Sequence, residues 1–153
     1  MSSVKDQLQS DLTAAMKARD ELATSTLRML RAAVLNAEVA GDEAIQLTDE
    51  QTIAVLQSEA KKRAESAQVY ADAGRTESAA KERAELEIIE RYLPAAMGDD
   101  ELAAIVDEEI ATAAAGGAEG PKAMGAVIKA VRERAGAAAD GSRIAALVKA
   151  RLT

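Results

Sequence analysis

The stretch MGAVIKAVRERAGAAADGSRIAALVKARL, Met124 to Leu152, carries the pattern that decides the fold. Its apolar residues recur at intervals of three and four, which is the spacing of one face of an α-helix. The break GAAADG at 136–141 lacks the spacing and the lysine of a nucleotide-binding P-loop. We therefore predict two short helices joined by a turn, in which Gly136 ends the first helix and Asp140 begins the second. The apolar positions are Met124, Val127, Ile128 and Val131, then Ile144, Leu147, Val148 and Leu152.

The composition extends this helical prediction to the whole chain. The sequence has 153 residues, of which 48% are apolar, and its only aromatic residues are Tyr70 and Tyr92. Ala, Leu, Glu, Lys and Arg are abundant, and these residues favour helices, whereas runs of β-branched residues are missing. We predict an all-α, multihelical protein that is long enough for one domain or two small ones.

Four helices are predicted in residues 1–94, which we expect to form a four-helix N-terminal bundle. Pro94 ends the last of them, because the residue before a proline resists the α conformation. The inner face of the first helix should carry Val4, Leu8, Leu12 and Met16. The first helix is expected to follow a capping pair of Ser3 and Asp6 and to end at about Lys17, and the second to run from about Asp20 to Ala40. The third should begin at a capping box of Thr48 and Gln51 and reach Tyr70, and Thr76 should cap the fourth.

Three shorter helices are predicted in residues 95–153, which we expect to form a small C-terminal bundle. The first begins near Asp99, because acidic residues suit the positive end of a helix dipole, and it ends at Gly116. Pro121 is expected in the first turn of the second helix. Asp140 is expected to cap the third. The domain boundary is placed between residues 94 and 98.

Charge is distributed unevenly along the chain. The net charge is −7, but from Pro121 onward seven basic residues stand against two acidic ones, so this tail carries +5 and the rest −12. Such asymmetry favours an anionic partner, nucleic acid above all. The tail has no aromatic residue on which bases could stack, so contact with the backbone of a folded RNA is expected. The candidate RNA-binding residues are Lys122, Lys129, Arg132, Arg134, Arg143, Lys149 and Arg151.

A second interpretation of the tail stays open. The same basic side chains could instead serve only to solvate the outer faces of two amphipathic helices. Those in the last turns, such as Lys149 and Arg151, would interact favourably with the negative ends of the helix dipoles.

Two further basic spots occur earlier. The run KKR at 61–63 follows Glu59, and the spacing of Glu59 and Arg63 favours a solvated ion-pair ladder along one helix. Arg28 and Arg31 adjoin apolar positions, and they either pair with carboxylates of another helix or contact RNA.

Much of the usual catalytic chemistry is excluded. The chain has no Cys and no His, and therefore no disulfide, thiolate nucleophile, Ser/His/Asp triad or common zinc site. The acidic clusters at 99–101 and 107–109 lack the histidines of di-metal helical bundles. We predict no catalytic residue, no metal and no cofactor. An apolar leader and a span of about 18 apolar residues are both missing, so a cytoplasmic protein without membrane contact is expected.

Five stretches resemble the GatB/YqeY family in its stand-alone, YqeY-like form, and they occur in the family's order. The similarity covers almost the whole chain. The stretches are STLRML (Ser25 to Leu30), NAE (Asn36 to Glu38), LTDEQTIAVLQSEAKKRAES (Leu47 to Ser66), ELEIIERYLP (Glu85 to Pro94), and MGAVIKAV with ADGSRIAALVKARL (Met124 to Val131 and Ala139 to Leu152).

The resemblance implies two small helical bundles, one of four helices and one of three. The same module forms the C-terminal tail of the GatB subunit of the aspartyl/glutamyl-tRNA amidotransferase, where it helps to hold the tRNA while other parts of the enzyme phosphorylate and amidate it. The family therefore carries a label of carbon-nitrogen ligase activity with glutamine as amido-N-donor. This sequence has no Cys glutaminase, no Ser-Ser-Lys amidase arrangement and no nucleotide-binding loop, so we do not expect catalysis by the chain alone.

The predicted function is that of a tRNA-associated adaptor or accessory protein, with tRNA and amidotransferase or other translation proteins as partners. The alternative is a helical protein–protein interaction module without an RNA role. In that case the acidic first 120 residues and the alanine face of the third helix, which carries Ala60, Ala64 and Ala67, would dock onto a partner.

Overall fold

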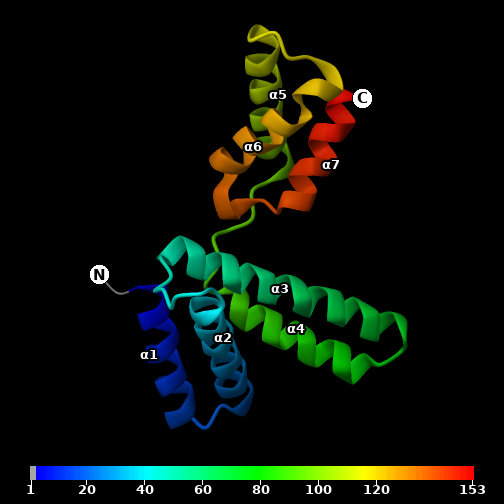
Figure 1. Ribbon diagram of the computed structural model, residues 1–153. Coiled ribbons are helices and arrows are strands. Elements are labelled where there is room, and N and C mark those ends of the chain that lie inside the picture. The colour runs from blue at the N-terminus through cyan, green and yellow to red at the C-terminus, as the bar shows by residue number, and fades with distance from the viewer. Residues whose placement is uncertain (1–2) are drawn as a thin grey trace. The chain divides into compact units, whose positions relative to one another are not determined.

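The computed structural model describes residues 3–153, and Met1 and Ser2 lie outside the described residues. The chain divides into two compact units, Met1–Leu93 and Pro94–Thr153. The described part contains seven α-helices and two short 3₁₀ turns but no strand (Figure 1). The prediction of an all-α fold is confirmed.

The first unit consists of two helical hairpins. α1 (Val4–Lys17) pairs with α2 (Glu21–Val39), and α3 (Asp49–Asp72) pairs with the adjacent α4 (Thr76–Glu90) (Figure 1). Leucine side chains from α1, α2 and α3 meet isoleucines of α4 in one aliphatic core, which includes Leu8, Leu12, Leu27, Leu30, Leu56, Ile88 and Ile89.

Local hydrogen bonds explain where most of these helices begin. The predicted capping boxes of Ser3 with Asp6 and of Thr48 with Gln51 are both formed. The prediction that Thr76 caps the fourth helix is wrong. Gly74 adopts a φ of +76° and reverses the chain so tightly that Thr76 already belongs to the first turn of α4, after an N-cap that makes no side-chain hydrogen bond.

Two apolar positions predicted to face inward lie on the surface. Met16 is 49% exposed, because the inner face of α1 runs from Leu12 to Ala15, three residues on, rather than to Met16. On α3, Ala60 and Ala67 are buried but Ala64 is exposed. Two of the three alanines of this face are therefore covered within the chain, where α3 packs along α4.

The second unit packs three helices around a separate aliphatic core. α5 (Asp99–Ala115) is followed by a 3₁₀ turn (Gly120–Ala123), α6 (Met124–Ala135), a second 3₁₀ turn (Gly136–Ala138) and α7 (Gly141–Leu152). Pro121 lies in the 3₁₀ turn that leads into α6 and not in the α-helix itself, because the chain enters α6 through this tighter turn. The core residues include Leu102, Val106, Val127, Val131, Ile144 and Val148.

The segment between α6 and α7 is a turn, as predicted. Gly136 ends α6 with a φ of +55°, in the region that glycine tolerates best. The carboxylate of Asp140 accepts a hydrogen bond of 3.2 Å from the backbone N–H of Ser142, which caps α7. No phosphate-binding loop of the P-loop type is formed, because Gly136 leads into a 3₁₀ turn.

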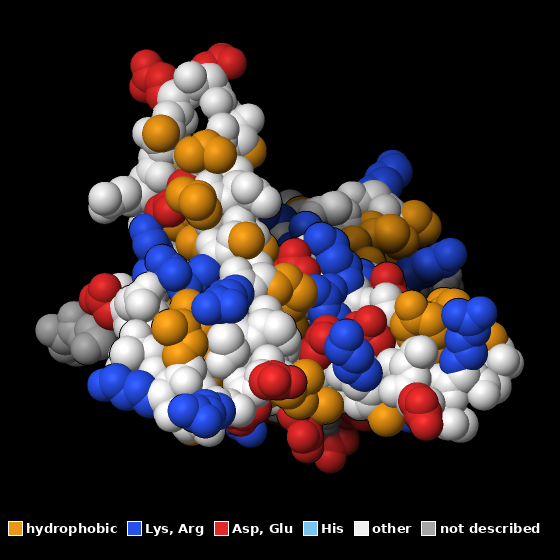
Figure 2. All heavy atoms as spheres, turned by 90° about the horizontal axis from the view of Figure 1, so that it is seen from below, with side chains coloured by type: hydrophobic (Ala, Val, Ile, Leu, Met, Phe, Trp, Pro, Cys, Tyr) orange, Lys and Arg blue, Asp and Glu red, His pale blue; other side chains and the backbone are white. Residues whose placement is uncertain are grey.

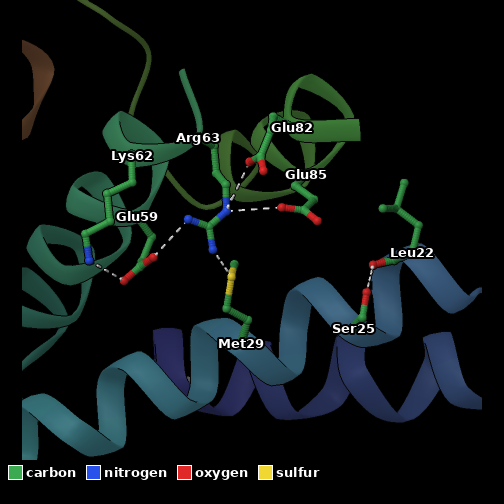
Figure 3. Close-up of polar contacts among 8 residues, drawn as sticks. All are labelled: Leu22, Ser25, Met29, Glu59, Lys62, Arg63, Glu82 and Glu85. Atoms are coloured by element: carbon green, nitrogen blue, oxygen red, sulfur yellow. Dashed lines mark hydrogen bonds and ion pairs between the residues drawn. The ribbon is translucent and has the colours of Figure 1, made fainter. Parts of the chain in front are cut away.

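Arg63 joins three helices of the first unit (Figure 3). Its guanidinium group lies 3.4 Å from Glu59 on α3. It also lies 3.1 Å from Glu85 and 3.7 Å from Glu82, both on α4. A third contact is a hydrogen bond from Arg63 to the sulfur of Met29 on α2. The predicted pairing with Glu59 is confirmed, but its solvated setting is wrong, since α4 leaves only 15% of the arginine side chain exposed.

This cluster contains more negative than positive charge. One oxygen of Glu82 is buried and accepts no hydrogen bond, so the guanidinium of Arg63 is the cation that compensates it. Glu59 also receives a hydrogen bond of 3.2 Å from Lys62. Arg63 is therefore the group on which the balance of charge between α3 and α4 depends.

Tyr92 makes the longest-range polar contact of the first unit. Its hydroxyl donates a hydrogen bond to the carboxylate of Asp11 and so links the residues that follow α4 to α1. Burial, together with the neighbouring negative charge of Asp11, raises the pKa of Tyr92 well above its ordinary value of 10.0. The neutral, hydrogen-bonding form of the phenol is thus favoured in the folded protein.

Replacing Arg63 by Met should lower the free energy of unfolding by about 2–4 kcal/mol, because three largely covered carboxylates lose their shared cation. Urea unfolding measures this change. Arg83→Met is the matched control, since Arg83 is an exposed α4 residue without an ion pair in the described part of the chain, and its effect should stay within about 0.5 kcal/mol. Equal unfolding midpoints for the two variants would contradict the role given to Arg63.

Stability should fall more steeply above pH 10 in the wild type than in Tyr92→Phe. The folded-state pKa of Tyr92 is raised, so its stabilising contribution is complete below the ordinary pKa of 10.0 and is lost as the pH rises toward the folded-state value. Urea midpoints measured between about pH 8 and 11 give the two slopes. An unchanged slope in Tyr92→Phe would argue against a raised pKa of Tyr92, and so against its burial beside Asp11.

Candidate nucleic-acid interface

The basic residues predicted to bind RNA are spread over three elements of the second unit. Lys122 lies in the first 3₁₀ turn, Lys129, Arg132 and Arg134 lie on α6, and Arg143, Lys149 and Arg151 lie on α7. The unit also contains nine acidic residues, so its net charge is −2 and that of residues 1–93 is −5. The positive charge of the tail is therefore a local feature of α6 and α7 and does not extend over the unit.

Arg134 is engaged by two carboxylates of α5. Its guanidinium lies 2.7 Å from Glu108 and 3.1 Å from Glu109. The hydrogen bond to Glu108, and next that to Glu109, raises the pKa of Arg134 above its already high ordinary value. This arginine stays charged, and its charge is directed at α5.

Two arginines of α7 also reach α5. Arg143 lies 2.6 Å from Asp99, and Arg151 pairs with Asp107. The side chains of Asp99 and Asp107 are 95% and 56% exposed, so solvent screens both pairs. Exposed pairs of this kind contribute only about 0–1 kcal/mol. Acidic side chains of α5 thus form ion pairs with three of the seven candidate cations, and these pairs add little to stability.

The remaining four cations make no ion pair with α5 in the described part of the chain, and all four are exposed: Lys122, Lys129, Arg132 and Lys149. Lys129 and Arg132 are three residues apart, so they share one side of α6. Arg132 lies over the start of α7, where a Cβ atom added to Gly141 would be 2.5 Å from its guanidinium. The four exposed cations thus lie along α6 and α7 and in the turn before α6.

The earlier basic pair, Arg28 and Arg31, lies in the first unit. Neither makes an ion pair with any described residue, so the first of the two alternatives, pairing with a carboxylate of another helix, is not observed. The guanidinium of Arg28 instead lies 3.8 Å from the sulfur of Met16. Both arginines line a groove between α1 and α2. Sequence reasoning missed this groove, although the apolar residues Leu35 and Val39, which lie outside the buried stripe of α2, were a signal for it.

Other kinds of site find no support in the described residues. Within residues 3–153, no group of three or more acidic residues is arranged to hold a metal ion. The helices of this part of the chain are all too short or too polar to cross a membrane.

The helices and their two separate cores define an all-α protein of two small helical units. The chain belongs to the YqeY-like family, because a family model described as "Yqey-like protein" matches residues 5–152 and so spans both units. No curated protein matches the sequence.

Proposed function

We propose that this protein is a tRNA-associated adaptor, which binds the phosphate backbone of folded tRNA along α6 and α7 and assists carbon-nitrogen ligase chemistry carried out by other proteins. The observation that carries the proposal is the division of the tail's charge. The acidic side chains of α5 engage Arg134, Arg143 and Arg151, whereas the exposed lysines at 122, 129 and 149 make no ion pair with α5.

Lysines without an ion pair are well suited to phosphate binding. No internal ion pair with α5 has to be broken when they meet a phosphate, and each contact releases counterions from the RNA. Arg132 adds a guanidinium group at the junction of α6 and α7, with a planar set of donors that can bind a phosphate through two hydrogen bonds.

The side chains of the second unit favour a structured RNA over an unpaired strand. Both tyrosines of the chain are in the first unit, so the second unit contains no aromatic ring on which an unpaired base could stack. Recognition by charge alone reads the backbone and overall shape of a structured RNA. A folded tRNA has these properties.

A tRNA titration at several salt concentrations tests the proposal. The wild type should bind folded tRNA with an affinity that falls steeply with salt. The variant Lys122→Glu, Lys129→Glu, Lys149→Glu should bind about tenfold more weakly or worse, with the slope of log affinity against log salt reduced by about 2 to 3. The matched control reverses three exposed cations of the first unit: Arg75→Glu, Lys81→Glu, Arg83→Glu.

The control variant should retain most of the wild-type affinity, since it has the same change in net charge at a different place. Absence of binding by the wild type at low salt, or equal losses in the two triple variants, would contradict the proposal. A gain of affinity is expected from Asp99→Asn with Asp107→Asn, because these substitutions free Arg143 and Arg151 to meet phosphates.

A further inference from the structure

The first unit carries a second surface, which the tRNA proposal does not use. Five large hydrophobic side chains are exposed in the described part of the chain, and four of them lie on α1, on α2 or in the loop after α2: Met16, Leu35, Val39 and Ile45. Leu35 and Val39 are 59% and 55% exposed and stand one helical turn apart, so they are neighbours on α2. Such clustering marks interaction sites more often than isolated exposed residues do.

A groove of about 410 Å³ runs beside these residues, between α1 and α2. Arg28, Arg31 and Leu35 line it from α2, while Lys5 and Gln9 line it from α1. A second hollow of about 420 Å³, at the turn between the two helices, shares Arg28 with the groove. Figure 2 shows the molecule from below relative to Figure 1, and on that face Lys and Arg side chains lie next to hydrophobic ones.

The carboxylates that line the groove are already engaged within the chain. Glu38 lies 2.6 Å from the ammonium group of Lys5 and accepts a hydrogen bond of 2.9 Å from the backbone N–H of Leu47. These hydrogen bonds, that of Lys5 first, lower the pKa of Glu38. Asp6 accepts a hydrogen bond of 3.2 Å from the backbone N–H of Ser3 in the capping box of α1.

The two arginines of the groove are in the opposite situation. Arg28 and Arg31 are exposed, are three residues apart and make no ion pair with any described residue. They therefore present two guanidinium groups on one side of α2, with Leu35 one turn further along. Guanidinium groups bind carboxylates through paired hydrogen bonds, and the exposed leucine adds an apolar contact.

We propose that the groove between α1 and α2 docks an acidic amphipathic helix of a partner protein, whose apolar face covers Leu35 and Val39 and whose carboxylates pair with Arg28 and Arg31. The charges are complementary, since the chain's own acidic groups in the groove are engaged and its arginines are open. An amphipathic helix laid in an apolar groove is a common mode of peptide recognition.

Two other occupants fit the surface less well. An RNA backbone would leave Leu35 and Val39 uncovered, and α1 and α2 have no aromatic side chain for stacking. A second copy of the chain, bound through the same groove on both partners, would bring the arginines of the two copies toward one another, because such an interface pairs a surface with itself. Like charges would then repel.

A displayed library of helical peptides of about 16 residues, with randomised surface positions, tests this docking site on the full-length protein. Selected peptides should be enriched in Asp and Glu beside Leu or Ile at helical spacing. The affinity of the best synthetic peptide, measured by fluorescence anisotropy, should fall about tenfold or more with Arg28→Glu, Arg31→Glu, and also with Leu35→Ser.

Each variant has a matched control elsewhere in the first unit. Arg75→Glu with Arg83→Glu repeats the charge reversal, and Val69→Ser removes an aliphatic side chain that is 66% exposed on α3. Both controls should bind the peptide within about twofold of the wild type. Arg28→Gln with Arg31→Gln removes the charge without reversing it and should also weaken binding. Circular dichroism melting checks that every variant is folded.

Four results would overturn the proposal: a selection without peptide binders, binders without acidic enrichment, binding unaffected by the Arg28 and Arg31 substitutions, or binding unaffected by Leu35→Ser. If analytical ultracentrifugation detected a dimer that these substitutions convert to a monomer, the groove would be assigned to a second copy of the chain instead. Loss of tRNA binding in the Arg28 and Arg31 variants would assign it to RNA. The outcome is independent of the tRNA proposal, because that proposal rests on residues of α6 and α7.

Discussion

The shared ion pair of Arg63 is the interaction on which the register of α3 and α4 depends. The facing surfaces of α3 and α4 carry alanines such as Ala60, Ala67 and Ala79, which bury little apolar area each. Apolar contact alone would therefore specify the register of these two helices poorly. Arg63 lies between Glu59 on its own helix and two carboxylates of α4, and it also reaches Met29 on α2. One largely covered charge thus sets the register of α3 and α4, and the aliphatic core shared by the four helices joins the two hairpins.

The second unit uses the same chemistry in a more exposed setting, with a different consequence. Arg134, Arg143 and Arg151 pair with carboxylates of α5, but solvent reaches these pairs and limits their contribution to stability. Their main effect is to decide which cations remain open. Residues 121–153 carry a net charge of +5, but the whole second unit, residues 94–153, carries −2 because it includes the acidic residues of α5. The cations without a partner on α5 lie on α6, on α7 and in the turn before α6.

The helices were predictable from the sequence because their signals are local. Apolar spacing and the capping residues Thr48 and Asp140 act within a few neighbours, and they gave the all-α class correctly. The partners of charged residues were not predictable in the same way. Arg63 meets Glu85 across 22 residues and Arg134 meets Glu109 across 25, so these pairs depend on how the helices pack. The groove beside Arg28 depends on that packing as well.

The central claim is that the two units carry separate surfaces, one for phosphates on α6 and α7 and one for an acidic helix on α1 and α2. An NMR titration of the isotope-labelled full-length protein with folded tRNA tests this claim most directly. The signals of Lys129, Arg132 and Lys149 should shift with salt-dependent affinity, while those of Arg28 and Leu35 should stay in place. Shifts centred on Arg28 and Leu35, or no shifts at low salt, would contradict it.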